Sequence, residues 1–280
     1  MRYYFNILFA FTVLATLSLT SCSEPDYPTP NVEAQNNTFT ARALFVNAAP
    51  GAPGLNLSIN NIQVGNTVNY SGQSPYRSFP LIANNNLSSG NTQIRAKAAS
   101  GQIGGTLGSS DLLFRAGANN QNNFNAANGR SYTVFVTDTL ARPKPTTPAG
   151  ATDPGGLRFL VVEDNLAAPS AGNAHVRFFH LAPGAPAVWI TVAGGPMLFA
   201  NRAYRETSTG SGTSAVNFVS FTPVAAGTYT LEVRTTSATG PIVLTVPNVT
   251  LVNGKIYTIY AQGRVGSSAT PLSAGVIVHN

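Results

Sequence analysis

Apolar and polar residues alternate along much of this chain, which is the pattern of half-buried β-strands. In residues 55–59 every second residue is Leu or Ile, and in residues 188–192 every second residue is Val or Ile. After residue 22 no stretch keeps an apolar period of 3.6 residues, so we expect few and short helices. The pattern therefore predicts an all-β fold.

The alternating stretches occur in two related series. The matching segments are 41–53 (ARALFVNAAPGAP) with 174–186 (AHVRFFHLAPGAP), 90–97 with 227–234, 128–135 with 253–260, and the closing strands 157–163 with 274–279. The offset is 133 residues for segment 41–53 and 125 residues for segment 128–135, which places length differences between the matched segments. Such differences belong in surface loops, here residues 101–128, 141–156 and 206–215.

One matching segment carries turn and corner signals. Asn128-Gly129 and Asn253-Gly254 lie between apolar runs, which favours a β-hairpin at each dipeptide. Tyr132 and Tyr257 then follow the turn at the start of a strand, in a position similar to that of a tyrosine corner.

About seven short strands in each series fit a β-sandwich. We therefore expect two tandem immunoglobulin-like/Greek-key β-sandwich domains, residues 39–168 and 173–280, joined by a linker at residues 169–172. The short linker predicts that the two sandwiches touch.

The first 38 residues indicate export and anchoring. Arg2 precedes an apolar run at residues 3–19, and the tetrad Leu-Thr-Ser-Cys ends at Cys22, which resembles a bacterial lipobox. We expect residues 1–21 to be removed as a lipoprotein signal peptide and Cys22 to carry the lipid. Residues 22–38 then form a flexible, proline-containing spacer. The alternative is an unpaired cysteine after an ordinary signal or anchor.

Cys22 is the only cysteine, so its acylation excludes disulfides and cysteine-based metal or catalytic sites. Acidic residues soon after it, Glu24 and Asp26, resemble the export signal of some surface lipoproteins. We therefore expect a lipid anchor in the outer membrane of a Gram-negative bacterium, at the cell surface rather than on the periplasmic face.

The composition adds little charge to this picture. Charged residues make up 9% of the chain, with 26 Gly and 19 Pro, which is typical of a folded β-protein with a neutral polar surface. The net charge of +6 comes from scattered Arg and Lys residues, not from a basic stripe with a recognisable motif. We expect no nucleic-acid partner.

The catalytic inventory is small, with three His and ten acidic residues. The chain has no nucleophile elbow, zinc-protease motif, phosphate loop or dinucleotide fingerprint, so we predict no catalytic residues, no metal site and no cofactor. Glu163 and Asp164 are neighbours whose side chains point to opposite faces of a strand. A hydrolase pair from separate strands, for example Asp138 with Glu163, remains an alternative.

Three residues are candidates for contacts outside the fold. Trp189, the only tryptophan, alternates with inward residues and should point outward to stack on a sugar ring or another partner, or else pack under a loop. His180 precedes the second Pro-Gly turn, where it contacts a ligand or binds the turn's backbone. Thr139, in Asp-Thr-Leu, is a candidate O-glycosylation site or the end of a strand.

Together the two Ala-Pro-Gly-Ala-Pro turns, residues 227–230 (GTYT), and Gly254-x-x-Tyr257-Thr258 resemble the family called domain of unknown function 4397. The resemblance covers nearly all of residues 40–280 as tandem copies. It implies secreted or lipid-anchored bacterial proteins with all-β units and supplies no activity. The first copy departs from the family pattern at Asn47, which stands where the second copy has His180.

These observations predict a non-enzymatic, lipid-anchored envelope protein whose two sandwiches serve binding or adhesion to a glycan, the matrix or a surface protein. The alternative is a structural or accessory subunit of an envelope complex that docks through its sheet faces. A hydrolase with an unrecognised site is the third alternative.

Overall fold

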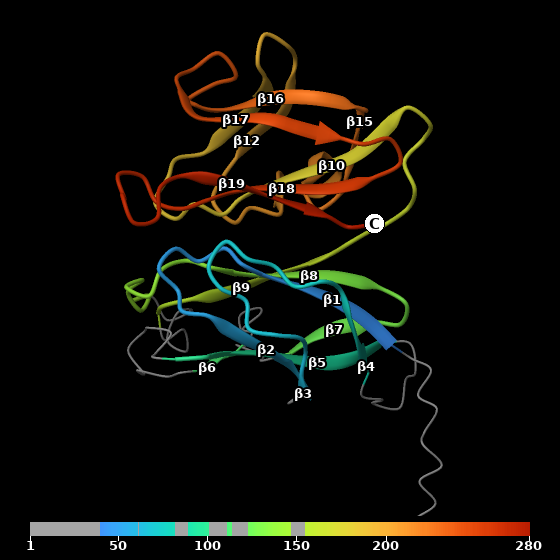
Figure 1. Cartoon of the computed structure of the whole chain (residues 1–280), viewed down its shortest axis with the longest axis vertical. Helices are drawn as coiled ribbons and strands as arrows, with labels where there is room; N and C mark the ends of the chain where they lie inside the picture. Colours follow the sequence, from blue (N-terminus) through green and yellow to red (C-terminus); the bar gives the residue numbers. More distant parts are fainter. Residues whose placement is uncertain (1–39, 61, 82–88, 101–110, 114–122, 147–154) are drawn as a thin grey trace, which may run out of the picture. The chain divides into compact units, whose positions relative to one another are not determined.

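The first half of the fold consists of two β-sheets (Figure 1). In this computed structural model the strands are β1 Thr40–Asn47, β2 Leu55–Ile59, β3 Ile62–Gln63, β4 Arg77–Pro80, β5 Ser89–Ala98, β6 Asp111–Leu113, β7 Asn123–Ala127, β8 Ser131–Thr137 and β9 Arg158–Glu163. One sheet has the order β4-β1-β8-β9, and the other has the order β3-β2-β5-β6 with β7 also paired to β5.

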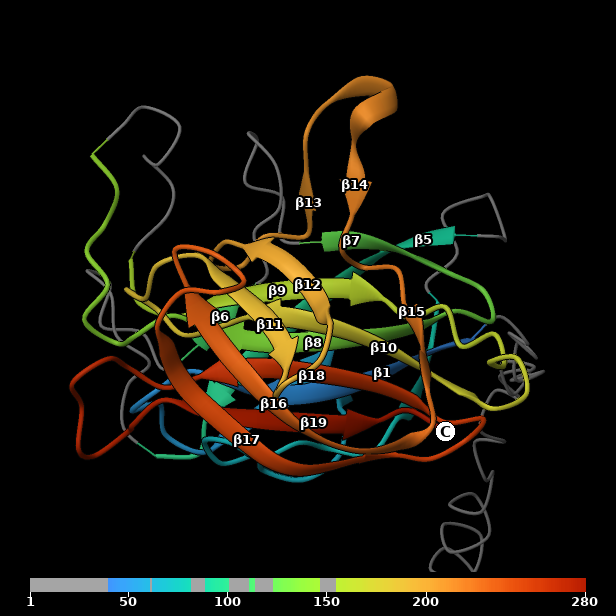
Figure 2. The same ribbon diagram turned by 90° about the horizontal axis from the view of Figure 1, so that it is seen from above.

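The second half repeats this plan. Its strands are β10 Asn173–His180, β11 Val188–Val192, β12 Met197–Arg202, β13 Ser208–Thr209, β14 Val216–Asn217, β15 Thr222–Ala225, β16 Gly227–Thr235, β17 Ile242–Leu251, β18 Ile256–Gln262 and β19 Ser273–Val278. They form the sheets β15-β10-β18-β19 and β12-β11-β16-β17, and the small ribbon β13-β14 extends away from both (Figure 2).

The structure describes residues 40–60, 62–81, 89–100, 111–113, 123–146 and 155–280, all of which belong to the unit Thr38–Asn280. Residues 1–21 and Cys22 lie outside them, as does most of the loop expected at residues 101–128. Within the described part, the only helix is the short 3-10 turn Gly212–Ser214. The all-β prediction is therefore confirmed.

The two halves share their strand order and strand directions. In each half the first strand runs parallel to the strand that begins after the Asn-Gly turn, with Ala43 opposite Tyr132 and Val176 opposite Tyr257. All other strand pairs of these two sheets are antiparallel. Within each half the two sheets enclose an apolar core, in the manner of a sandwich.

The Asn-Gly hairpins predicted from the sequence are wrong. The turn at Gly129 joins β7, which pairs with β5, to β8, which pairs with β1 and β9. The turn at Gly254 likewise joins β17 to β18 across the sandwich. Both glycines adopt the left-handed conformation, with φ of +73° and +77°. The strand after each turn pairs with the first strand of its half. Each turn therefore connects the two sheets of its sandwich and does not form a hairpin.

The side chains next to these turns explain the repeated Tyr. The hydroxyl of Tyr132 accepts the backbone N–H of Ala127 at 2.9 Å, and that of Tyr257 accepts the N–H of Val252 at 3.0 Å. The phenol ring thus closes the corner between the two sheets, as the resemblance to a tyrosine corner predicted.

A third apolar cluster lies between the halves. It joins residues of β1, β8 and β9 to residues of β10, β18 and β19, with Phe135 contacting both Phe179 and Tyr260 at ring-centroid distances of 5.7 and 5.6 Å. The central strands β1, β8, β10 and β18 of these two sheets are consequently buried on both faces over most of their length. This double burial explains why residues 43–49 are all buried and show no alternation.

Candidate functional site

Trp189 lies on the outer face of the sheet β12-β11-β16-β17. Its neighbours Val188 and Ile190 are buried in the core of the second half, and Trp189 itself is half-buried on the opposite face of β11. This sheet lies nearest the viewer in Figure 2. The alternation expected at Trp189 is therefore present, and the indole is neither fully exposed nor enclosed by the core.

An anchored arginine stands directly beside Trp189. Arg234 of β16 is its cross-strand partner, and Glu232 is the partner of Thr191 in the next outward position. The Arg234 guanidinium donates through Nη2 to Glu232 Oε2 at 2.6 Å, through Nε to Thr191 Oγ1 at 3.2 Å and through Nη1 to the Gly240 carbonyl at 2.7 Å. These bonds fix the guanidinium in one orientation.

The corresponding face of the first half is different. There Asn56 is the cross-strand partner of Lys97, in the positions that Trp189 and Arg234 occupy in the second half. Asn56 Oδ1 accepts a hydrogen bond from Thr67 Oγ1 at 2.7 Å. The combination of an aromatic ring with a fixed guanidinium and carboxylate is thus a property of the second half.

Such a surface has a defined binding chemistry. An indole offers a large apolar face, and the adjacent Arg234 and Glu232 offer a hydrogen-bond donor and acceptor within the same patch. Compounds with an apolar face and polar edges, such as pyranose rings, match this combination. We call Trp189, Thr191, Glu232 and Arg234 the Trp189 surface.

His180 binds the backbone of the turn that follows it. Its Nδ1 accepts the N–H of Ala182 at 3.3 Å, and its Nε2 lies 3.0 Å from the carbonyl of Pro186. Asn47 makes the same pair of bonds in the first half, through Oδ1 to the Ala49 N–H and through Nδ2 to the Pro53 carbonyl. This is the arrangement that the structural interpretation of His180 predicted. Burial lowers the pKa of His180, which keeps the ring neutral.

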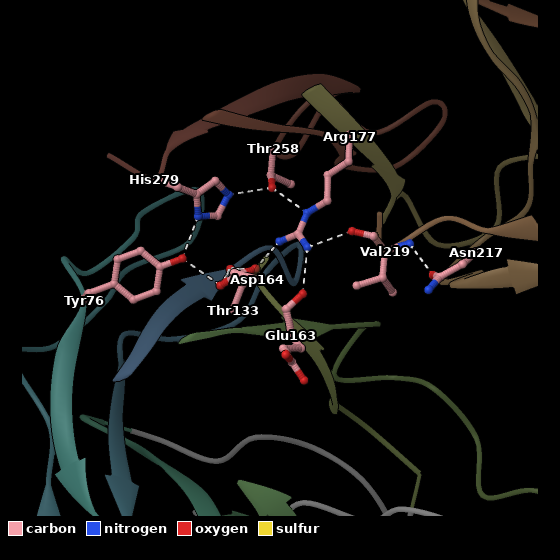
Figure 3. A network of polar contacts seen from close by, with 9 residues as sticks. All are labelled: Tyr76, Thr133, Glu163, Asp164, Arg177, Asn217, Val219, Thr258 and His279. Carbon is pink, nitrogen blue, oxygen red and sulfur yellow. Dashed lines mark hydrogen bonds and ion pairs between the residues drawn. The ribbon is translucent and has the colours of Figure 1, made fainter. Parts of the chain in front are cut away.

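A buried polar network, which sequence reasoning missed, joins the two halves (Figure 3). Arg177 and Asp164 form an ion pair with both side chains fully buried. Tyr76 donates to Asp164 Oδ2 at 2.6 Å and Thr133 donates to the same atom at 2.8 Å. Arg177 and Asp164 come from different halves, so the ion pair links them directly.

The network closes into a ring through His279. Because the only hydroxyl hydrogen of Tyr76 goes to Asp164, Tyr76 Oη accepts from His279 Nδ1 at 2.6 Å. His279 Nε2 then accepts the hydroxyl hydrogen of Thr258 at 2.7 Å, and Thr258 Oγ1 accepts from Arg177 Nε at 2.8 Å. His279 is therefore neutral with its hydrogen on Nδ1. Burial and the Arg177 charge lower its pKa to about 3.

Thr139 follows Asp138, whose carboxylate lies 3.8 Å from Arg205 Nη1 and thus makes a second charged contact between the halves. Asp138 is buried with φ of +71°, and its carboxylate accepts from Arg158 Nε at 2.6 Å. Its backbone N–H donates to the Tyr204 hydroxyl of the second half at 3.0 Å. Thr139 follows this fixed residue in a turn and is half-buried. Asp138, the acidic residue of the candidate glycosylation tripeptide, is thus held in place by contacts within the fold.

The acidic residues considered for catalysis bind separate arginines. Asp138 pairs with Arg158, whereas Glu163 pairs with Arg130 at 3.3 Å. Within the described ranges, no three His, Cys, Asp or Glu side chains gather as a metal site would require. The same residues include no helix that is long and apolar enough to span a membrane. Cys22 is not among them.

Comparisons with known proteins give one family match. The model described as "Domain of unknown function (DUF4397)" matches residues 41–191, which is more than half of the 280 residues. The match spans the first half and continues through β10 into β11. It occurs once, so the tandem family copies expected from the sequence are corrected to a single match.

Among solved structures, the chain is similar to a protein from Bacteroides uniformis ATCC 8492 described as a "putative cell adhesion protein". The sequence identity is 12%, the TM-score is 0.22, and the alignment covers 86% of this chain and 96% of the other. Similarity at this level establishes no activity. No curated protein sequence matches the chain.

Proposed function

Because the chain belongs to the DUF4397 family, which carries no assigned activity, we propose a function from the geometry of its own residues. The protein is a non-enzymatic, lipid-anchored protein of the bacterial cell envelope that serves binding or adhesion. Its ligand is a glycan, which the Trp189 surface contacts.

One observation carries this proposal, the half-buried indole of Trp189 beside the anchored guanidinium of Arg234. A fixed arginine loses little conformational freedom when a ligand binds, which favours affinity for polar groups. The indole supplies the apolar contact that a sugar ring needs. Glu232 uses Oε2 for Arg234, and its Oε1 has no hydrogen-bond partner among the described residues. That atom remains available as an acceptor for a sugar hydroxyl.

The experiment is a glycan array probed with residues 23–280 and with three variants. Trp189→Ala should lose at least ten-fold in affinity for the glycans that the wild type binds, and Trp189→Phe should lose less because an aromatic face remains. Asn56→Ala is the matched control, since Asn56 holds the equivalent position in the first half. Equal binding by the wild type and Trp189→Ala would refute the proposal.

The anchor is proposed at Cys22, with residues 22–38 as a spacer to the folded part and the cell surface as the location. Support comes from the Leu-Thr-Ser-Cys tetrad after an apolar run. Metabolic labelling with a fatty-acid probe should mark the wild type and not Cys22→Ala. External protease added to intact cells should then cleave the wild type, whereas protection would place it on the periplasmic face.

The two halves are proposed to be separate β-sandwich domains, residues 39–168 and 173–280, joined by the linker at residues 169–172. Support comes from their equal strand orders and from the identical bonds of Asn47 and His180 to their turns.

Exposed apolar residues favour a second candidate function, that of an accessory subunit in an envelope complex. Val276 and Val278 lie exposed on β19, which forms the edge of its sheet. Exposed edges of this kind are available to another protein. Co-purification of a stoichiometric partner that is lost with Val276→Lys, together with unchanged glycan binding, would select this candidate.

A further inference from the structure

The second half contains a cavity. It has a volume of ≈ 410 Å³ and lies at one end of the sandwich, between the strands β10 and β18 on one side and β11, β16 and β17 on the other. Its walls include His180, Val188, Val233, Leu244, Ala261 and Val265. This volume lies in the range of small-molecule sites.

The small side chain of Ala261 accounts for part of the empty space. Ala261 of β18 lies directly opposite Ala274 of β19. In the equivalent pair of the first half, Val136 of β8 lies opposite Phe159 of β9, and both are buried in the core. The equivalence follows from the corner tyrosines, because each strand residue lies four positions after Tyr132 or Tyr257. The second half therefore lacks a phenyl ring and two methyl groups at this place.

The loop over the cavity also has less-buried apolar side chains than its counterpart in the first half. In the first half Leu140 packs against the core and Leu157 is buried. The residue equivalent to Leu140 is Val265, eight positions after its corner tyrosine, and 62% of Val265 is exposed. Leu272, which precedes β19 as Leu157 precedes β9, is only half-buried. The loop at residues 263–272 thus leaves an apolar opening at the cavity.

The lining determines what the cavity can hold. All lining residues are apolar except His180 and Thr235. Both ring nitrogens of His180 are bound to the turn at Ala182 and Pro186, so the ring offers neither a charge nor a free donor. A charged group would be costly to bury there, whereas a hydrocarbon group would gain contacts with the walls.

We infer that this cavity is a binding site for the uncharged hydrocarbon chain or ring of a small molecule. The site is separate from the Trp189 surface, because Val188 and Val233 line it from the inner face of the sheet whose outer face carries Trp189. The inference therefore does not depend on glycan binding.

The test uses the neutral probe N-phenyl-1-naphthylamine and residues 23–280, which contain every described residue. We expect saturable binding with one probe per chain and displacement by decanol. If decanoate also displaces the probe, the site recognises the hydrocarbon chain alone. If only decanol displaces it, the site rejects a charged headgroup.

The decisive variant is Ala261→Val with Ala274→Phe, which copies the packing of the first half. It should lower the probe affinity at least ten-fold and raise the Tm, because the void is filled. Ala215→Val, which adds the same methyl groups to an exposed residue between β13 and β14, should change neither value. Should the double variant fail to fold, Ala261→Val alone should still weaken binding several-fold. No saturable binding to the wild type, no displacement by decanol, or equal binding by a folded cavity-filling variant would overturn the inference.

Discussion

Acidification should weaken the fold through His279. The ring is buried between the halves and accepts a hydrogen bond at Nε2 from Thr258. A second proton would have to sit on Nε2, facing that hydroxyl and close to the Arg177 charge. The folded state therefore resists protonation, whereas the unfolded chain does not.

The sign and size follow from the pKa of His279, which is lowered from its usual 6.5 to about 3 in the folded state. Because the unfolded chain binds the proton more readily, the stabilisation is complete above pH 6.5 and decreases as the pH falls toward 3. At 1.36 kcal/mol per pH unit, linkage gives a loss of about 2 kcal/mol between pH 8 and pH 5.

Urea denaturation of residues 23–280 at pH 8, 7, 6 and 5 measures this loss, with His279→Gln as the comparison. The variant removes the titrating group, so the difference in unfolding free energy between wild type and variant should shrink by about 2 kcal/mol on going to pH 5. The comparison cancels the contributions of His180 and of the carboxylates. A difference that stays constant across this range would refute the neutral state of His279 in the folded protein.

Three further predictions concern single polar contacts, each measured by urea denaturation at pH 7. Asp164→Asn should lower the free energy of unfolding by about 3–5 kcal/mol, because it leaves the Arg177 charge buried without its counterion. A decrease below about 1 kcal/mol would contradict the burial of the pair. Tyr257→Phe should lower the free energy of unfolding by about 1 kcal/mol, because the Val252 N–H loses its acceptor. An unchanged urea midpoint would contradict a stabilising role of this hydrogen bond. His180→Asn should lower the free energy of unfolding by less than about 1 kcal/mol, because Asn47 makes the same bonds in the first half. His180→Leu should lower it by about 1–3 kcal/mol. Equal decreases for both variants would contradict the role of His180 in binding the turn.

Local patterns in the sequence predicted the strands and several contacts correctly. Alternation placed Trp189 on the outer face of β11, because side chains of neighbouring strand residues point to opposite faces. The repeated tyrosines predicted the corners, since a phenol near a tight turn reaches backbone that is close in sequence. Asn47 in place of His180 indicated a shared structural role that two different side chains can fill.

Long-range pairing could not be predicted from these patterns. The Asn-Gly turns favour hairpins locally, but β8 and β18 pair with the first strand of their half, so the turns connect different sheets. The network around Asp164 and His279 combines residues far apart in the chain. One available signal was the lack of alternation in residues 43–49, which indicates a strand buried on both faces. Polar side chains near the ends of such strands could therefore have been predicted to lie in a buried interface between the halves.

The glycan-binding role of the Trp189 surface is tested most directly by the fluorescence of Trp189, the only tryptophan in the chain. A glycan selected from the array is titrated into residues 23–280, and the emission spectrum is recorded. Stacking of a sugar on the indole predicts a saturable change in emission with the same Kd as the binding measured by calorimetry. Calorimetric binding of the glycan without any change in Trp189 emission would contradict the account.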